Sequence, residues 1–484
     1  MRVIHWFRRD LRVHDNPALQ RACRIGDEVI GLVVLHPSTI DRTKQLPRRL
    51  RFLLLQIEAL KDSLARIGGR LVLRYGLPEH AVPNVVQEWG AKWVTWNEDI
   101  EHTDSDRDER IRQSLSAMGC YSGIEQDQYL VPLSVLKASR KEPIQTFEVF
   151  YKVWRTHLSE ASSSSGEPAP EPLKAGRTIS PKSDPFPIST QFHVASDKAL
   201  PPPGEQPAIR RLERWIEILA TPPSPQPAEK RVSPSAAVSS GISPYLRFGV
   251  LSIRQCMDAA RPLLNQRARE MTRTAAELWV ARLARREYYN YLFFHFPRVM
   301  QEPFNIELST IRWETNQAHL TAWKEGKTGY PIVDAAMRQM AIEGYAPQWA
   351  REIAAHFYIK DLMLDWRQGM NIFYSLMLDA DMANNVGNWQ RVASFTPDAD
   401  PFWRVPNPAR FSREMDPSGE YIRRYVPELV RLPKEYVHEP WTLPHRGQTA
   451  LRFFVGQDYP VPIVSHDQRR EEIIRRYRTA SHSE

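Results

Sequence analysis

The stretch Asp379-Ala-Asp-Met-Ala-Asn-Asn-Val-Gly-Asn-Trp389 gathers acids, amides and an oxidisable ring, and the rest of the chain can be read outward from it. In a helix, Asp381, Asn385 and Trp389 recur at intervals of four residues and share one face. An acid can accept from an N–H, an amide can donate to a ring nitrogen, and an indole can supply an electron, a set that suits a flavin. The alternative is a capped helix end, because Asp and Asn favour caps and turns.

Length and composition indicate an ordinary soluble globular protein. The chain has 484 residues, enough for two or three domains, and 42% of them are hydrophobic. Lys and Arg number 65 against 57 Asp and Glu, and the resulting net charge of +8 favours a polyanionic partner such as nucleic acid. A basic surface without such a partner is the alternative.

The three cysteines, Cys23, Cys120 and Cys256, are far apart and form no C-x-x-C pair. Their spacing encodes neither a disulfide framework nor a zinc or iron–sulfur site, so we expect no metal. No stretch approaches the length of a membrane span, and the first apolar run is too short for a signal sequence. We therefore expect a cytoplasmic protein that does not bind membranes.

Apolar runs alternate with helical segments over the first 130 residues. Asp15-Asn-Pro17 caps and opens the first helix. Strands are expected at Val3–Phe7, Val29–Leu35, Leu71–Tyr75 and Trp93–Trp96, and helices from Pro47 to Gly68, His80 to Trp89 and Asp104 to Met118. This alternation predicts an α/β, Rossmann-like lobe with a parallel five-stranded sheet and helices on both faces. No G-x-G-x-x-G follows the first strand, which argues against an ordinary NAD site.

From about Ser159 to Pro234 the composition shifts to Ser, Pro and Gly, which indicates a long linker with one helical piece near Ile209–Leu219. After Ser235 the pattern is helical without strands. The expected helices are Thr274–Phe294, Pro331–Glu343, Trp349–Trp366, Met370–Asp379 and Asp467–Thr479. We therefore divide the chain into an α/β domain at 1–130, an interdomain linker at 131–234 and an all-α domain at 235–484.

Three features of the helical half suggest chemistry. The segment from Ser239 to Ser243 places hydroxyls and a glycine at a helix start, which suits a pyrophosphate, although a plain serine cap is the alternative. Arg351 and Asp379 form either one buried bridge beside a cofactor or two solvated side chains. Separate segments of the helical half begin with Trp313, Trp366 and Trp389. These indoles could form a chain for electron transfer, and ordinary core packing is the alternative.

Over nearly its whole length the chain resembles the photolyase/cryptochrome family of flavoproteins, and it is similar to class I cyclobutane pyrimidine dimer photolyases. The motifs that carry the resemblance are Trp6-Phe-Arg-Arg-Asp-Leu-Arg12 with Asp15-Asn-Pro17, Trp323-Lys-Glu-Gly-Lys-Thr-Gly-Tyr-Pro-Ile-Val-Asp334, Asp379–Trp389 and Asn407-Pro408, in the family's order. The family's fold is an α/β antenna lobe joined by a long linker to a helical lobe that holds FAD. This agrees with the architecture predicted above.

The resemblance also implies how FAD is held. The residues that match the family's phosphate and cofactor contacts are Ser239, Ser240, Gly241, Ile242, Ser243, Trp279, Arg286 and Gln348. Arg351 and Asp379 match the salt bridge beside the isoalloxazine, and Asp381 matches its ring partner. Asn385 matches the residue that faces flavin N5, where asparagine is the photolyase type and plant cryptochromes carry an acid. Trp389, Trp366 and Trp313 match the photoreduction chain, proximal to distal.

In photolyases, excited FADH⁻ gives an electron to a pyrimidine dimer flipped out of the duplex, the ring splits, and the electron returns. The resemblance therefore implies DNA containing pyrimidine dimers as the partner, with an Arg-rich helical half for phosphate contacts. We expect a monomeric, FAD-dependent deoxyribodipyrimidine photolyase driven by blue or near-UV light. The alternative is a cryptochrome-like blue-light photoreceptor that has lost dimer repair.

The chain departs from the class I pattern where the lesion binds. Arg282 and Arg285 replace a Glu and a Trp that hold the lesion, and Glu352 and Arg391 replace a Met and a second Trp. The residues expected to face DNA or the lesion are Arg231, Arg282, Arg285, Trp349, Glu352 and Arg391. A charged cleft loses base stacking and gains attraction for phosphate.

The sequence does not decide the identity of the antenna chromophore. Trp96-Asn-Glu-Asp-Ile-Glu101 and Asp106-Arg-Asp108 are family-like, but Thr103 and Asp104 replace the Asn-Glu expected for a folate. A deazaflavin, a folate, a second flavin and no antenna all remain alternatives.

Overall fold

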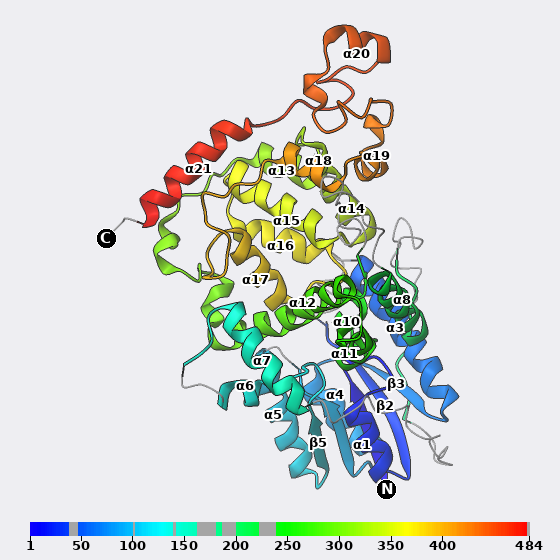
Figure 1. Ribbon diagram of the computed structural model, residues 1–484. Coiled ribbons are helices and arrows are strands. Elements are labelled where there is room, and N and C mark those ends of the chain that lie inside the picture. Colours follow the sequence, from blue (N-terminus) through cyan, green and yellow to red (C-terminus); the bar gives the residue numbers. More distant parts are fainter. Residues whose placement is uncertain are drawn as a thin grey trace. The chain divides into compact units, whose positions relative to one another are not determined.

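The computed structural model describes residues 1–37, 47–99, 102–138, 142–161, 181–185, 200–221 and 239–481 (Figure 1). The chain divides into two compact units. The sheet unit comprises Met1–Ile144, Val149–Pro222 and Ser240–Phe294, and the helical unit comprises Gln145–Glu148, Pro223–Ser239 and His295–Glu484.

A five-stranded parallel sheet in the order β3-β2-β1-β4-β5 forms the centre of the sheet unit. The strands are β1 (Arg2–Phe7), β2 (Glu28–Leu35), β3 (Arg70–Tyr75), β4 (Trp93–Asn97) and β5 (Tyr121–Glu125). The helices between them are α1 (Pro17–Ile25), α3 (Pro47–Arg66), α4 (Pro78–Trp89) and α5 (His102–Ala117). The predicted α/β fold is confirmed. As expected, Asn16 caps α1, since its side chain accepts from the Leu19 N–H, and Pro17 occupies the first turn.

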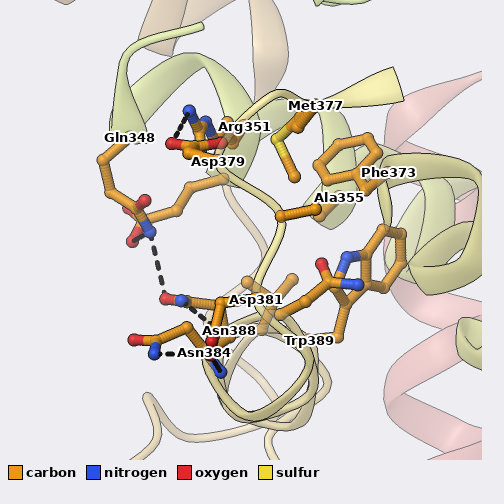
Figure 2. Close-up of a pocket in the computed structure, with 14 residues that line it drawn as sticks. Gln348, Arg351, Ala355, Phe373, Met377, Asp379, Asp381, Asn384, Asn388 and Trp389 are labelled. Carbon is orange, nitrogen blue, oxygen red and sulfur yellow. Dashed lines mark hydrogen bonds and ion pairs between the residues drawn. The ribbon is translucent and has the colours of Figure 1, made fainter. Parts of the chain in front are cut away.

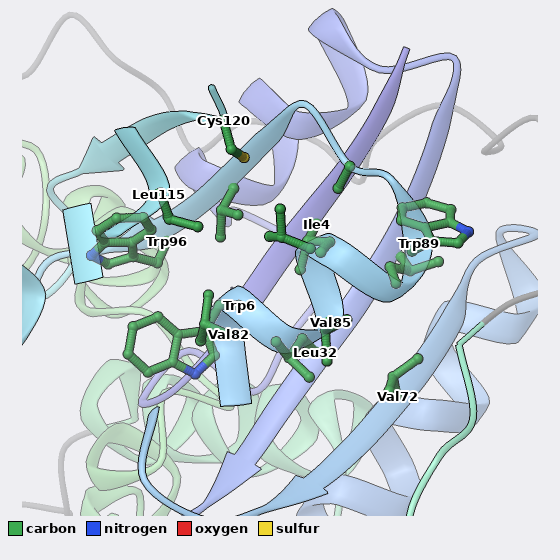
Figure 3. Close-up of a cluster of buried hydrophobic side chains, with 14 of the residues drawn as sticks. Ile4, Trp6, Leu32, Val72, Val82, Val85, Trp89, Trp96, Leu115 and Cys120 are labelled. Carbon is green, nitrogen blue, oxygen red and sulfur yellow. The ribbon is translucent and has the colours of Figure 1, made fainter. Parts of the chain in front are cut away.

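One face of the sheet packs against α4 and α5 through a cluster of buried apolar side chains (Figure 3). Trp6 and Trp96 from neighbouring strands lie in it with ring centroids 5.9 Å apart, and Trp89 ends α4 against the same cluster. Each large side chain buried in this way contributes about 1.5–3 kcal/mol. The opposite face lies against α3, where Gly31 leaves room for Leu64.

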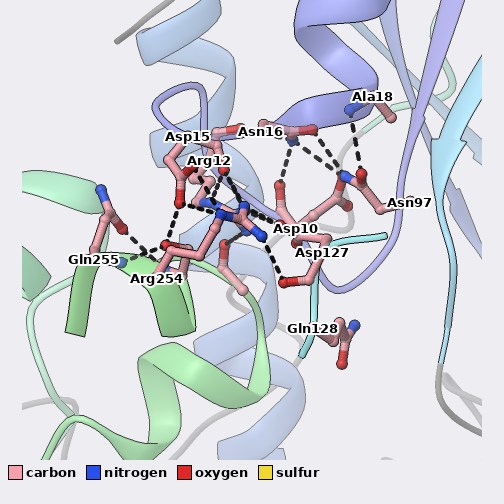
Figure 4. A network of polar contacts seen from close by, with 12 residues as sticks. Asp10, Arg12, Asp15, Asn16, Ala18, Asn97, Asp127, Gln128, Arg254 and Gln255 are labelled. Carbon is pink, nitrogen blue, oxygen red and sulfur yellow. Dashed lines mark hydrogen bonds and ion pairs between the residues drawn. The ribbon is translucent and has the colours of Figure 1, made fainter. Parts of the chain in front are cut away.

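Charged side chains form a buried network beyond the carboxyl ends of β1 and β4 (Figure 4). Asp10 accepts hydrogen bonds from Asn97 at 2.6 Å and Asn16 at 3.1 Å. Burial alone would raise the pKa of Asp10, but its hydrogen bond with His5 and the other donors lower that pKa to about 2. The partners of Asp10 named above, His5, Asn16 and Asn97, all come from the first 97 residues of the chain.

The same network reaches α11 (Ile253–Ala260) through Arg254. The Arg254 guanidinium donates to Asp15 at 3.0 Å and to Asp127 at 2.6 Å, and Arg12 also pairs with Asp127. All of these side chains are at least four-fifths buried. Residues near position 254 therefore complete the core of the sheet unit.

Further helices follow the sheet in sequence. They are α6 (Leu133–Ala138), α7 (Phe147–Ala161), α8 (Glu205–Ala220), α10 (Ser243–Arg247), α11, η4 (Arg261–Leu264) and α12 (Glu270–His295). The predicted helical piece near Ile209–Leu219 corresponds to α8. The predicted linker 131–234 contains α6 and α7 as well, because an apolar run with aromatic residues such as Phe150 and Trp154 packs against α12. The Ser-rich segment at 162–165 lies outside the described residues.

The helical unit contains no named strand among its described residues. Its elements are η5 (Pro297–Met300), η6 (Ile306–Thr310), α13 (Gln317–Glu325), α14 (Pro331–Glu343), α15 (Gln348–His356), η7 (Phe357–Asp361), α16 (Trp366–Leu376), α17 (Met382–Val392), α18 (Pro408–Met415), α19 (Glu420–Tyr425), η8 (Pro427–Leu429), η9 (Pro440–Thr442), α20 (His445–Leu451) and α21 (His466–Ser481). The all-α prediction is confirmed for the part of the chain that the structure describes.

Two helix predictions in this unit are wrong in detail. The segment predicted as one helix from Trp349 to Trp366 is α15 followed by the π-helical turn η7, and Trp366 instead begins α16, capped by Asp365. The helix predicted to end at Asp379 ends at Leu376. Asp379 therefore lies in the short connection between α16 and α17, and Trp389 lies inside α17 rather than at the start of a segment.

Candidate functional site

A pocket of about 60 Å³ in the helical unit lies between α15, α16 and α17 (Figure 2). Its lining residues are Gln348, Arg351, Glu352, Ala355, Phe373, Met377, Asp379, Ala380, Asp381, Asn384, Asn385, Asn388, Trp389 and Val392. Most of the helical-unit residues predicted from the sequence as cofactor contacts are among them. The pocket wall thus combines one ion pair, several amides and two aromatic rings.

Arg351 and Asp379 form the ion pair, with Nη2 of Arg351 2.8 Å from Oδ2 of Asp379. The side chains are 17% and 4% exposed, so the pair is buried and the solvated alternative does not hold. Burial lowers the pKa of Arg351, but the adjacent Asp379 carboxylate more than offsets this and raises it. The guanidinium therefore stays charged beside the pocket.

Asp381 caps α17 instead of lying within it. Its Oδ1 accepts from the backbone N–H of Asn384 at 3.0 Å and from the Asn384 side-chain amide at 2.9 Å. The capped helix end that the sequence left as an alternative is therefore real, and Asp381 lies at the cap, one turn before Asn385, instead of inside the helix. Asp381 still lines the pocket from the cap position.

Asn385 is buried on the first turn of α17 and lines the pocket. Its Nδ2 donates to the Met370 carbonyl oxygen at 2.9 Å. This bond uses one of the two N–H donors of the amide and fixes its orientation, and the carbonyl oxygen of Asn385 can accept from an N–H on a ligand.

Trp389 closes the pocket on the side of α16. Tyr358 and Phe373 meet its indole edge to face, at centroid distances of 5.6 and 5.1 Å. Such contacts fix the plane of a ring in a core. The indole is 2% exposed, so this part of the pocket wall is buried.

The other two predicted electron-chain tryptophans share one neighbour. Phe395 lies 6.0 Å from Trp366 and 6.4 Å from Trp313 between ring centroids. Trp366 is 1% exposed, whereas Trp313 is half-buried. Trp366 and Trp313 therefore share Phe395 as a neighbour, with Trp313 nearer to solvent, and the order from Trp389 through Trp366 to Trp313 stays a prediction.

A polar chain flanks the pocket where α15 faces α17. Gln348 donates to Glu352 and to Asn388, both at 3.1 Å, and Glu352 also pairs with Arg391. Figure 2 shows Gln348 reaching toward Asn388 across the pocket. Glu352 and Arg391, two of the residues predicted to face the lesion, thus neutralise each other within the helical unit.

Trp349 does not line the pocket. Its ring packs against Tyr421 at 4.8 Å and Phe411 at 6.2 Å, on α19 and α18. The remaining predicted residues, Ser240, Gly241, Ile242, Ser243, Trp279, Arg282, Arg285 and Arg286, lie in the sheet unit, on the α10 approach and on α12. Arg231 lies outside the described residues.

Arg211 contacts the backbone of the segment before α10. Gly241 has a φ of +60°, and the Arg211 guanidinium lies over it while Nε donates to the Ser240 carbonyl at 2.9 Å. On α12, Trp279 is buried and Arg286 donates to the Gln128 carbonyl at 2.9 Å.

Sequence reasoning missed Tyr345, Asn384 and Asn388. Asn384 and Asn388 lie four residues apart in α17 and share a helix face. This spacing is visible in the sequence 379–389 and could have identified them. For Tyr345 there was no signal, because its partners Ser239 and Arg351 are brought together only by the fold.

Two family models match the chain, the DNA photolyase model over residues 3–173 and the FAD-binding domain of DNA photolyase over residues 279–479. The chain belongs to the photolyase/cryptochrome family. It is 33% identical to the deoxyribodipyrimidine photo-lyase of Synechococcus sp., covering 97% of this chain and 95% of that protein. It is also 33% identical to the deoxyribodipyrimidine photo-lyase of Escherichia coli, covering 98% of each.

Solved structures from both branches of the photolyase/cryptochrome family share the fold. A class III photolyase from Agrobacterium tumefaciens superposes with a TM-score of 0.88 at 30% identity, covering 99% and 98% of the two chains. A Synechocystis cryptochrome superposes with a TM-score of 0.84 at 25% identity, covering 98% of each chain. An archaeal photolyase from Sulfolobus tokodaii, solved with two FAD molecules, gives 0.79 at 27% identity over 99% and 100%.

The residues of the pocket suit the FAD that this family binds. A buried guanidinium–carboxylate pair, the acceptor end of Asn385 and the side chain of Asp381 offer donors and acceptors to the polar edge of a flavin. Phe373, Met377 and Trp389 supply apolar surface for its rings. Among the residues that the structure describes, no group of three or more His, Cys, Asp or Glu is placed to hold a metal. No described helix is both long and apolar enough to cross a bilayer.

Proposed function

We propose that this protein is an FAD-dependent DNA photolyase that splits cyclobutane pyrimidine dimers under blue or near-UV light. The observation that carries the proposal is the single pocket wall on which Arg351–Asp379, Asn385 and Trp389 meet. The Synechococcus and Escherichia coli relatives, which the chain matches over nearly their whole length, are deoxyribodipyrimidine photo-lyases, and this supports the same substrate class. The net charge of +8 supports a nucleic-acid partner.

When bound, FAD supplies the light absorption and the electron that open the cyclobutane ring. The chain's own residues then have distinct roles. Arg351 and Asp379 would fix the polar edge of the flavin. The Arg351 guanidinium would stabilise negative charge added to the flavin ring. The carbonyl end of Asn385 accepts from a flavin N–H, and an amide has no proton to give back near neutral pH. Trp389 and the indoles beyond it would carry an electron from an external reductant toward oxidised FAD.

The proposed contacts to DNA come from separate parts of the chain. Arg282 and Arg285 lie on α12 and carry positive charge for phosphates. Glu352 and Arg391 replace apolar lesion contacts with a closed ion pair, so the lesion would be held more by hydrogen bonds than by stacking. We also propose that the protein is a monomer and that the helical residues from 235 onward bind FAD, although residues 240–294 among them pack as part of the sheet unit.

A cryptochrome-like photoreceptor is the second candidate, and the Glu352–Arg391 pair is the observation that favours it. This pair occupies the flank of the pocket with two matched charges, which disfavours a stacked base. The family's Synechocystis cryptochrome has the same fold. In this case the flavin photochemistry would be retained and repair lost.

One assay separates the two candidates. The purified FAD-loaded protein is photoreduced, mixed with an oligonucleotide that carries a thymine dimer, and illuminated at 360–450 nm while the absorbance of the restored bases is followed. We expect absorbance to recover in the light and not in the dark. No recovery from a protein whose flavin reduces normally would reject dimer repair and leave the photoreceptor.

A further inference from the structure

One short turn, residues 344–346, holds both members of the Arg351–Asp379 pair. The backbone N–H of Leu378, which precedes Asp379, donates to the Gly344 carbonyl at 2.8 Å. Nε of Arg351 donates to the Ala346 carbonyl at 2.6 Å. The turn therefore fixes the backbone that carries the anion and the side chain that carries the cation.

Tyr345 lies between these two carbonyls in sequence and makes two further contacts with different parts of its side chain. Its ring faces the Arg351 guanidinium, with Cζ 5.0 Å from the ring centroid. Its hydroxyl shares a hydrogen bond of 2.5 Å with Oγ of Ser239. The ring thus acts on the ion pair, and the hydroxyl acts on the first residue of the segment proposed for the FAD phosphates.

The turn cannot adopt this shape with another residue at its start. Gly344 has a φ of +66°, and a Cβ there would lie 2.9 Å from Cγ of Leu378. The glycine allows the chain to leave α14 and brings Tyr345 against Arg351. The arrangement is a consequence of the backbone and does not depend on a mobile side chain.

We propose that Tyr345 is a positioning residue that couples the two ends of the FAD site. Its hydroxyl orders Ser239 at the diphosphate end, and its ring orients Arg351 at the flavin end. This inference rests on the proposed function, since it takes Ser239 as a phosphate contact and Arg351–Asp379 as the flavin contacts, all of them in the helical unit. The chemistry needs only a cation–π contact and one neutral hydrogen bond.

The hydroxyl is tested by Tyr345→Phe and Ser239→Ala with apoprotein and oxidised FAD. Each variant should bind FAD about three- to tenfold more weakly, the usual effect of one neutral hydrogen bond. The double variant should lose no more than Ser239→Ala alone, because Ser239→Ala already removes the bond that Tyr345→Phe removes. Additive losses, or wild-type affinity in both variants, would overturn the coupling at the phosphate end.

The ring is tested by Tyr345→Leu, with the flavin midpoint potential as the readout. Loss of the ring loosens Arg351, so the potential should move to a more negative value, whereas Tyr345→Phe keeps the ring and should keep the potential. Tyr425→Phe is the matched control, because its hydroxyl donates to Glu343 and neither residue lines the pocket. A Tyr345→Leu protein with the wild-type potential would overturn the inference at the flavin end. No DNA is present, so a failure of dimer repair leaves these results unaffected.

Discussion

The indole of Trp389 lies directly on the backbone of Gly369, so that a Cβ at position 369 would be 2.3 Å from Cη2 and 2.7 Å from Cζ3 of the ring. Gly369 is one turn after Trp366 on α16. Trp389 therefore packs on the face of α16 that also carries Trp366, and Gly369 places no side chain between Trp389 and that face.

Adding a methyl group at this contact should displace the ring without removing it. We expect Gly369→Ala to slow photoreduction of bound FAD and to lower the free energy of unfolding by about 1–3 kcal/mol, the usual cost of overpacking a core. Time-resolved absorbance and denaturant titration measure the two effects. Met370→Leu, on the next residue of α16, is a volume-conserving control; equal photoreduction rates in both variants would show that ring placement does not matter.

Removal of the indole itself should be more severe for electron transfer. Trp389→Phe should keep FAD bound, because Arg351, Asp379 and Asn385 are untouched, yet photoreduction should be at least tenfold slower since phenylalanine is much harder to oxidise than tryptophan. Trp349→Phe, whose ring contacts Tyr421 away from the pocket, is the matched control. Unchanged kinetics in Trp389→Phe would refute the assigned electron path.

The lesion contacts can be tested by restoring an aromatic ring on α12. Arg285→Trp should bind an oligonucleotide with a thymine dimer more tightly, by about 1–3 kcal/mol, because one stacked base contributes that much. Binding in the dark by fluorescence anisotropy is the measurement, with undamaged DNA of the same sequence as control. Equal affinities for damaged and undamaged DNA in this variant would contradict the proposed place of Arg285.

Stability should fall between about pH 4.5 and 7 because of Glu287. Burial raises the pKa of this carboxyl to about 7, against the hydrogen bonds that it accepts from Leu130 and Trp154. The folded state therefore holds a proton that the unfolded state has released, so its contribution is full below the unfolded pKa and is lost as the pH rises through 7.

Chemical denaturation of Glu287→Gln across this range is the test. The variant should show a flatter pH profile than the wild type, whose loss should be on the order of 2–3 kcal/mol. Glu277→Gln on the same helix should retain the wild-type slope. A wild-type slope in Glu287→Gln would mean that Glu287 is charged in the folded protein.

The sequence predicted elements well wherever one local signal decides the structure. Apolar runs located four strands, and Asn16 with Pro17 located the start of α1. Strand β5 (Tyr121–Glu125) had no such run, because it lies at the edge of the sheet and only Gly123 in it is buried. The break at Phe357–Asp361 was missed because an apolar run has the same pattern in α- and π-helical turns.

For the pocket, residue type carried more information than position. The acids, amides and indole of 379–389 do reach one cavity, although Asp381 does so as a helix cap. Contacts such as Tyr345 with Ser239, or Glu352 with Arg391, join residues many positions apart and depend on how helices pack. Spacing alone cannot encode them.

The ion pairs of Arg254 with Asp15 and Asp127 limit where the chain could be truncated. A truncated product that stopped at residue 221 would keep the five strands of the described sheet, yet Asp15 would lie in the interior without its cation and Asp127 would keep only Arg12. Stranding a buried carboxylate in this way costs about 3–5 kcal/mol, a large part of the stability of a small domain. The α/β lobe is therefore no transplantable module, and a graft of it into another protein would have to bring residues 240–260 along.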